Sequence, residues 1–178
     1  VFELLVESKK KIIGHNCLYD FMFTYSHFLE ALPPNYIEFK QNFSDCFPGN
    51  QKSAFPLIFR IYDTKFIINQ TSLSSKIKAW TSLQEVYDLT RDEQDKDFSQ
   101  IKISFAEGFD SYGKEDSKFH EAGYDAYCTG YIFAKMINTI SNQEKEKVRN
   151  CINNLYSFFY VKNCEITYEE PWFKKVES

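Results

Sequence analysis

Glycine is scarce in this chain of 178 residues, which holds six glycines and no cluster of them. Loops that cradle phosphate groups need closely spaced glycines, and the sequence contains neither a P-loop nor a glycine-rich dinucleotide loop. The GxSxG string of serine hydrolases and the HExxH string of zinc peptidases are absent too. Any chemistry must therefore rest on a different arrangement of residues from these common motifs.

Cysteine pairs and long apolar runs are also missing. The five cysteines are an odd number, and no two of them form a CxxC pair: Cys17, Cys46, Cys128, Cys151 and Cys164. This spacing argues against a disulfide framework and against a zinc site. No segment predicts a transmembrane helix or a signal peptide. We expect an intracellular protein, cytoplasmic or nuclear, with anchoring to an organelle surface through a segment outside this chain as the alternative.

The chain lacks an excess of positive charge, since its formal net charge is −4 and its pI about 5.5. Binding to phosphate groups without sequence preference needs clustered Lys or Arg, so any contact with nucleic acid must come from a local groove. Aromatic residues are plentiful, with 18 Phe and 12 Tyr. We interpret most of them as core residues, because large apolar side chains are usually buried.

Strand and helix patterns alternate along the chain and predict an α/β layer fold. Residues 11–15 indicate a short buried strand, and the apolar spacing from Leu18 to Leu32 predicts a helix that ends before Pro33-Pro34. Further predicted elements are helices at 2–10, 35–47, 82–89 and 123–140, a strand from 59 that turns helical after Asp63, a loop at 48–56, and strands at 155–161 and 165–168.

The first polar motif lies at the start of the helix that follows strand 11–15. Asn16 and Asp20 are four residues apart, so on a regular helix they would lie about 40° apart on one face. The segment after a strand end is where α/β proteins tend to bind ligands. The alternative is purely structural, with Asn16 as a helix cap and Asp20 placed in the first turn by the helix dipole.

The second polar motif is His120 with Asp125. On one regular helix these residues would point about 140° apart, so they can converge only if His120 precedes the helix proper. His120 could then remove a proton from a water molecule beside a metal ion held by Asp125. The alternative is a surface histidine next to an acidic residue of a first helical turn.

Together these motifs resemble the second and third motifs of the DEDD exonucleases, in the variant that carries histidine. Several further short strings resemble those of the poly(A)-specific ribonuclease family and occur in the same order, over roughly residues 1–140. Tyr36–Asn42 also resembles the piRNA-trimming relative of that family. The matching strings are Ile13–Asn16, Leu32-Pro33, Phe39-Lys40, Phe47-Pro48, Asp63–Lys65, Ala106–Phe109 and His120–Tyr127.

The resemblance implies a ribonuclease-H-like α/β fold and two Mg²⁺ ions held by four carboxylates. It makes Asp20 and Asp125 metal ligands and His120 the general base, and it places Asn16 and Lys65 against the RNA. The implied activity is 3′-to-5′ removal of 5′-nucleotides from single-stranded RNA, either poly(A) tails or small-RNA precursors. A homodimer is implied as well.

The first motif of that family, Asp-x-Glu, does not occur in this chain. Fifteen residues precede Asn16, none of them is Asp, and no Asp anywhere is followed two positions later by Glu. We therefore expect residues 1–178 to form the C-terminal half of a nuclease domain, with the missing Asp and Glu supplied by an N-terminal half outside this chain. Without that half, we expect no stable monomer, because sheet edges and apolar faces would lie open.

Two other functions remain open at this point. A nuclease fold that has lost catalysis would act as an RNA-binding or scaffold module, and an upstream sequence without Asp-x-Glu would favour it. A DNA-directed exonuclease of the same fold would cleave DNA and RNA equally, whereas a site that reads the 2′-hydroxyl would prefer RNA. The joint presence of Asp20, His120 and Asp125 favours the active ribonuclease.

Overall fold

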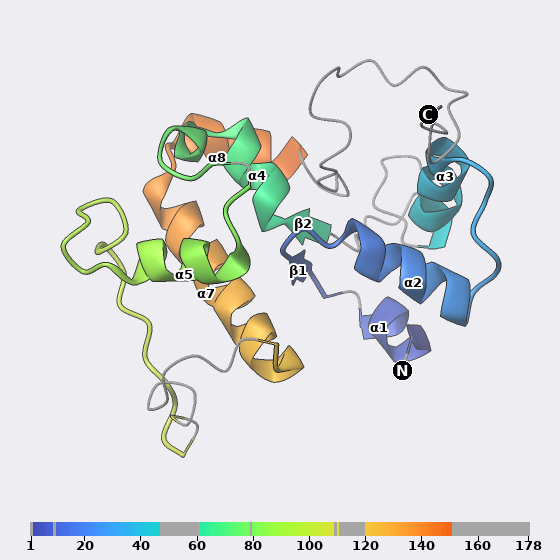
Figure 1. Ribbon diagram of the computed structural model, residues 1–178, viewed down its shortest axis with the longest axis horizontal. Coiled ribbons are helices and arrows are strands. Elements are labelled where there is room, and N and C mark those ends of the chain that lie inside the picture. Colours follow the sequence, from blue (N-terminus) through green and yellow to red (C-terminus); the bar gives the residue numbers. More distant parts are fainter. Residues whose placement is uncertain are drawn as a thin grey trace, which may run out of the picture. The chain divides into compact units, whose positions relative to one another are not determined.

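The computed structural model describes residues 2–8, 10–46, 61–78, 80–108, 110 and 120–150 (Figure 1). The predicted loop at 48–56 and the predicted strands at 155–161 and 165–168 lie outside these residues. The chain divides into two compact units. The first contains the described residues up to Ile12 and from Asn16 to Tyr62, and the second contains Ile13–His15 and the described residues from Asp63 onward.

Two short strands form a small parallel sheet, β1 (Ile12–Gly14) and β2 (Ile61–Asp63). Both were expected from their apolar residues, and β2 is buried along its whole length. Each strand ends where a polar segment begins, His15 after β1 and Thr64 after β2. The carboxyl ends of parallel strands are the usual ligand-binding edge of an α/β sheet, so a ligand-binding site is expected near these two ends.

The helices described in the first unit are α1 (Phe2–Ser8), α2 (Leu18–Phe28) and α3 (Tyr36–Cys46). Their shared core is aromatic, with the Tyr25 ring edge-on to Phe39 at 5.4 Å and Phe21 tilted against Phe43 at 5.1 Å. The prediction for α2 is wrong at its end, because the helix stops at Phe28 rather than near Leu32.

The second unit begins with α4 (Thr64–Gln70), followed by the 3₁₀ helix η1 (Ser72–Ser75) and by α5 (Leu83–Arg91). The predicted turn to helix after Asp63 is confirmed. A capping box begins α5: Ser82 Oγ accepts from the Glu85 N–H at 3.2 Å, and the Glu85 carboxylate accepts from the Ser82 N–H at 2.7 Å.

Helix α7 (Ala122–Thr139) is the long helix of the second unit, and α8 (Asn142–Asn150) follows it. The buried face of α7 includes Tyr124, Cys128, Ile132 and Met136. No described helix has the length and apolar character that crossing a membrane requires.

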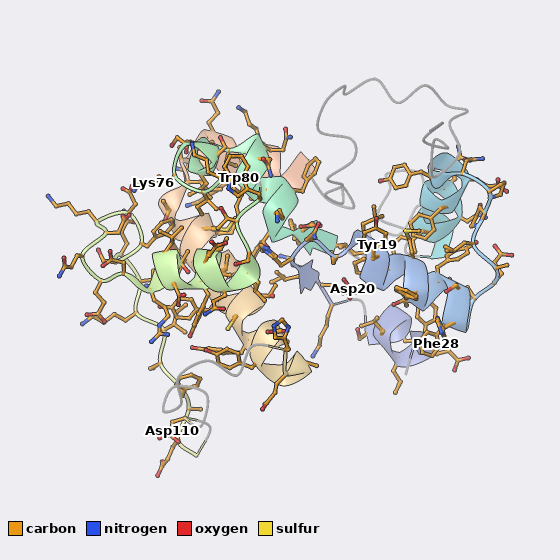
Figure 2. All side chains as sticks on the ribbon, viewed as in Figure 1. Tyr19, Asp20, Phe28, Lys76, Trp80 and Asp110 are labelled. Atoms are coloured by element: carbon orange, nitrogen blue, oxygen red, sulfur yellow. The ribbon has the colours of Figure 1, made fainter. Side chains whose placement is uncertain are left out.

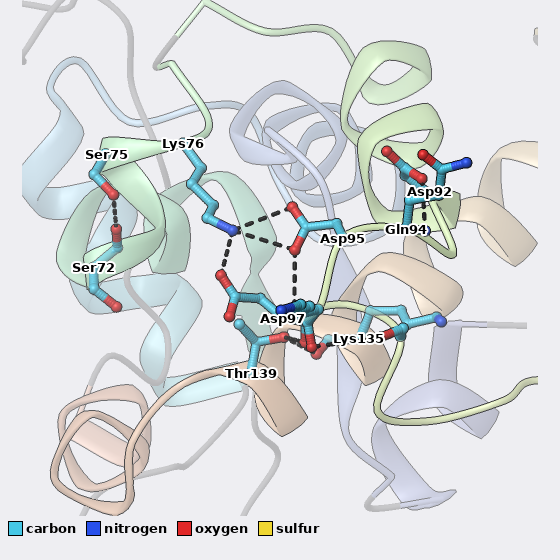
Figure 3. Close-up of polar contacts among 11 residues, drawn as sticks. Ser72, Ser75, Lys76, Asp92, Gln94, Asp95, Asp97, Lys135 and Thr139 are labelled. Carbon is cyan, nitrogen blue, oxygen red and sulfur yellow. Dashed lines mark hydrogen bonds and ion pairs between the residues drawn. The ribbon is translucent and has the colours of Figure 1, made fainter.

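A polar network fixes the turn that runs from Asp92 to Ile101 (Figure 3). Lys76 forms ion pairs with Asp95 and Asp97, and Lys135 Nζ donates to the carbonyls of Phe98 and Ile101, each at 2.8 Å. The Lys135 side chain is buried, so these charge-assisted bonds satisfy an ammonium group that would otherwise be costly to bury. Within this turn, Asp92, Glu93, Gln94 and Lys96 are exposed to solvent.

Candidate nuclease site

His120 and Asp125 come together at the start of α7. Glu121 is the N-cap of this helix, Asp125 lies in its first turn, and His120 precedes it, as the sequence requires. The His120 N–H donates to Asp125 Oδ1 at 3.3 Å, and the Asp125 N–H donates to the Glu121 carbonyl at 2.9 Å. The Asp125 carboxylate therefore reaches back over the segment that carries the histidine.

The backbone of two predicted site residues is left-handed. Among the described residues, Asn16 (φ 56°) and His120 (φ 78°) are the non-glycine positions with positive φ. Such conformations are uncommon for residues with a Cβ atom, although Asn and His adopt them more often than most. Strained backbone tends to occur at functional sites, where it aims a side chain that regular structure would point elsewhere.

Asn16 and Asp20 belong to the first unit, at the beginning of α2. The N-cap of α2 is Cys17, whose side chain makes no capping hydrogen bond, so the interpretation of Asn16 as the helix cap is wrong. Asn16 lies outside the helix, and the 40° estimate for one helical face does not apply. Asp20 is in the first turn, and its exposed side chain lies on the surface of α2 (Figure 2).

Lys65 lies in the first turn of α4, just after β2. Its N–H donates to Asp63 Oδ1 at 2.9 Å, and its Nζ donates to the Thr81 carbonyl at 3.1 Å. Burial lowers the pKa of Lys65, against the opposing charges of Asp63 and Glu85. Lys65 is half-buried, and both its backbone N–H and its amine donate hydrogen bonds within the second unit.

The residue that sequence reasoning missed is His15. Its Nδ1 lies 2.9 Å from Thr64 Oγ1, and the Thr64 hydroxyl donates to the Gly14 carbonyl at 3.1 Å. The Nε2 atom is buried and has no hydrogen-bond partner among the described residues. The signals in the sequence were that His15 is the last residue of the predicted strand 11–15 and that Thr64 follows the predicted strand that begins at 59.

Burial lowers the pKa of His15 to about 4, with the Asp63 carboxylate opposing this shift and the Lys65 charge adding to it. In the unfolded chain the histidine has a pKa of about 6.5. Between about pH 4 and 6.5 the unfolded chain therefore binds a proton that the folded chain does not bind. Stability from the neutral imidazole is therefore present above pH 6.5 and is lost as the pH falls from 6.5 to 4. The expected contribution of the neutral imidazole to the free energy of unfolding is on the order of 3 kcal/mol, at 1.36 kcal/mol for each unit by which the pKa is lowered.

Urea unfolding of the full-length protein that contains this chain, as wild type and as a His15→Asn variant, at pH 7 and at pH 4.5, measures this contribution. The wild type is expected to lose roughly 2 kcal/mol more stability than the variant over that interval, because asparagine does not titrate. Equal losses in the two proteins would contradict the assignment of a buried, neutral His15.

The predicted residues thus divide between the units. Asn16 and Asp20 lie in the first, and Lys65, His120 and Asp125 lie in the second. Within the described part of the chain, no group of three or more His, Cys, Asp or Glu residues is arranged to hold a metal ion. The two candidate ligands are nevertheless carboxylates, and hard oxygen donors of this type suit hard divalent cations.

This fold and these motifs are those of a nuclease. The sequence pattern that describes the CAF1 family ribonucleases matches residues 1–133, and the chain belongs to that family. Its members have the ribonuclease-H-like DEDD fold and depend on divalent metal ions. The predicted fold class and family are thereby confirmed.

Curated relatives agree with this assignment. Poly(A)-specific ribonuclease PARN is 36% identical over 142 residues in Pongo abelii and 35% identical over 142 residues in Homo sapiens. The pre-piRNA 3′-exonuclease trimmer of Bombyx mori is 32% identical over 143 residues. The alignments cover 80%, 80% and 76% of this chain but 20%, 20% and 24% of the relatives. The chain therefore spans between a fifth and a quarter of their length.

Proposed function

We propose that the protein containing this chain is a Mg²⁺-dependent 3′-to-5′ exoribonuclease that releases 5′-nucleotides from single-stranded RNA. The observation that carries this proposal is the pairing of His120 with Asp125 at the start of α7, joined by the 3.3 Å bond from the His120 N–H to Asp125 Oδ1. Membership of the CAF1 family supports it, as do the relatives named for poly(A) and for pre-piRNA 3′ ends.

The roles of the residues follow from their chemistry. Asp20 and Asp125 would hold divalent cations together with an Asp and a Glu from another part of the protein. When bound, such cations polarise a phosphate and neutralise developing negative charge. His120 accepts the proton of the attacking water at a ring nitrogen, while the phosphorus gains the water oxygen and the bond to the 3′-oxygen of the penultimate nucleotide breaks. That oxygen takes a proton from solvent water as it leaves, and His120 later returns its own proton to solvent.

Lys65 and Asn16 bind the substrate in this scheme. An ammonium group pairs with a backbone phosphate as a point charge and reads no base, so Lys65 suits a sequence-independent contact. The Asn16 amide can donate to a phosphate or sugar oxygen and accept from a hydroxyl. Single-stranded RNA is required because the terminal nucleotides must leave the helical stack to reach the site.

The experiment uses the full-length protein that contains this chain and a 5′-labelled oligo(A). We expect a ladder of products shortened from the 3′ end in Mg²⁺, and no products in EDTA. A DNA oligomer of the same length is expected to be cleaved at least tenfold more slowly. RNA bound without shortening would favour the scaffold function, and equal cleavage of DNA would favour the DNA exonuclease. A pre-piRNA-like RNA in the same assay distinguishes the two RNA substrates.

A further inference from the structure

The ends of the two strands are joined by a relay of two hydrogen bonds. It runs from His15 Nδ1 to Thr64 Oγ1 at 2.9 Å, and from the Thr64 hydroxyl to the Gly14 carbonyl at 3.1 Å. All three residues belong to the second unit, although 49 positions separate His15 from Thr64. Thr64 is fully buried, so water does not compete for its hydroxyl. We name these three residues the strand-end relay.

The relay fixes the protonation of the imidazole ring. A threonine hydroxyl has one hydrogen, and here that hydrogen is donated to the Gly14 carbonyl. Thr64 Oγ1 can then only accept from His15, so His15 Nδ1 must carry the ring proton. Nε2 is left with its lone pair, in a buried position without a partner among the described residues. The relay therefore requires a proton on Nδ1, and the buried Nε2 without a partner disfavours a second proton on the ring.

The relay acts on the first turn of α4, which carries Lys65. Thr64 is the first residue of α4, and Lys65 follows it directly. The Asp63 carboxylate accepts from the N–H groups of Lys65 and Phe66, at 2.9 Å and 3.4 Å. These capping bonds orient the turn relative to its own strand, β2. The relay ties the same turn to the neighbouring strand, β1.

We propose that His15 and Thr64 are positioning residues that hold Lys65 where it meets the RNA backbone. This inference rests on the proposed function, because it takes Lys65 as the phosphate contact. Loss of the relay would leave α4 folded through its Asp63 cap, but its first turn would lose the side-chain link to the end of β1. Affinity for RNA would fall, while the His120 and Asp125 chemistry would be affected much less.

RNA affinity of the full-length protein, measured in EDTA to prevent cleavage, tests the proposal. Lys65→Gln is expected to weaken oligo(A) binding about tenfold and to reduce the slope of log affinity against log salt by about 0.7, the value for one phosphate contact on a single strand. Thr64→Val, which keeps the shape but removes the hydroxyl, is expected to weaken binding about fivefold and to lower the same slope. A purely structural defect would leave that slope unchanged.

Two rescue variants and one control separate positioning from stability. Thr64→Ser keeps the hydroxyl and His15→Asn keeps an N–H donor near the Nδ1 position, so both are expected to bind within twofold of the wild type. His15→Leu has no donor and is expected to behave like Thr64→Val. The control is Thr71→Val at the other end of α4, since Thr71 is buried and its hydroxyl donates to the Ile67 carbonyl within the same helix. It should leave binding unchanged.

The double variant Thr64→Val with Lys65→Gln distinguishes the possible outcomes. If the relay acts through Lys65, Thr64→Val causes no further loss once Lys65 is replaced, so the two effects are not additive. Full additivity, or an unchanged affinity in Thr64→Val beside a weakened Lys65→Gln, would overturn the relay proposal alone. Unchanged affinity in both single variants would instead overturn the proposed RNA contact.

Discussion

Replacing Asp125 with asparagine is expected to lower kcat of the full-length enzyme by at least a thousandfold. The change removes the negative charge that the proposed divalent cation needs, and carboxylate oxygens are the ligands such cations prefer. It keeps an acceptor oxygen in the Oδ1 position, where Asp125 now accepts the His120 N–H at 3.3 Å. The start of α7 should therefore stay in place, and the loss can be attributed to charge.

The measurement is single-turnover shortening of oligo(A) over a range of Mg²⁺ concentrations. Asp88→Asn is the matched control, because Asp88 is an exposed carboxylate on α5 in the same unit. The control is expected to keep full activity, and both variants are expected to melt within a few degrees of the wild type. Activity of Asp125→Asn within tenfold of the wild type would remove Asp125 from the site.

Much of the secondary structure could be predicted because its signals are local. The Asp63 side chain caps the helix that follows it, and Glu85 closes the capping box with Ser82. The position of His120 ahead of α7 was also predictable, since a five-residue spacing does not put two side chains on one helical face. In each case, the residues that determine the structure lie within a few positions of one another.

The end of α2 could not be predicted from the apolar pattern. Apolar residues continue at helical spacing to Leu32, yet Phe28 and Leu29 are 59% and 40% exposed. The Tyr25 carbonyl accepts from both the Leu29 and Glu30 N–H groups, at 2.9 Å and 3.3 Å, and the Tyr25 hydroxyl donates to the Glu30 carboxylate. These bonds turn the chain away from the helix axis, and apolar periodicity carries no information about them.

Helix α8 and the strand-end relay were missed for opposite reasons. Helix α8 is almost wholly polar, so it has no apolar stripe. Its local signal was the pair Ser141 and Glu144: the Glu144 N–H donates to Ser141 Oγ at 3.2 Å, and the Ser141 N–H donates to the Glu144 carboxylate at 3.0 Å. The relay joins His15 to Thr64 across 49 positions, and no rule based on neighbouring residues connects them. The relay also assigns a specific contact to the histidine of the Ile13–Asn16 string, which the resemblance left without a role.

Replacing His120 with glycine is expected to lower kcat by a factor of about 10² to 10⁴, the usual contribution of a general base. Glycine is the informative substitution because the backbone of His120 has φ 78°, a conformation that glycine adopts without strain. The variant removes the imidazole and leaves the turn before α7 relaxed. KM for oligo(A) should stay within about threefold, since binding is assigned to other residues.

Chemical rescue separates a base from a merely structural histidine. Imidazole added to His120→Gly is expected to restore activity in proportion to its concentration, because the small base can occupy the vacated space and accept the proton of the attacking water. The same addition should have no effect on Asp125→Asn, which lacks a ligand rather than a base. His27→Gln, a change at the exposed histidine of α2, should remain fully active. A His120→Gly enzyme with kcat within tenfold of the wild type would show that another group accepts the proton.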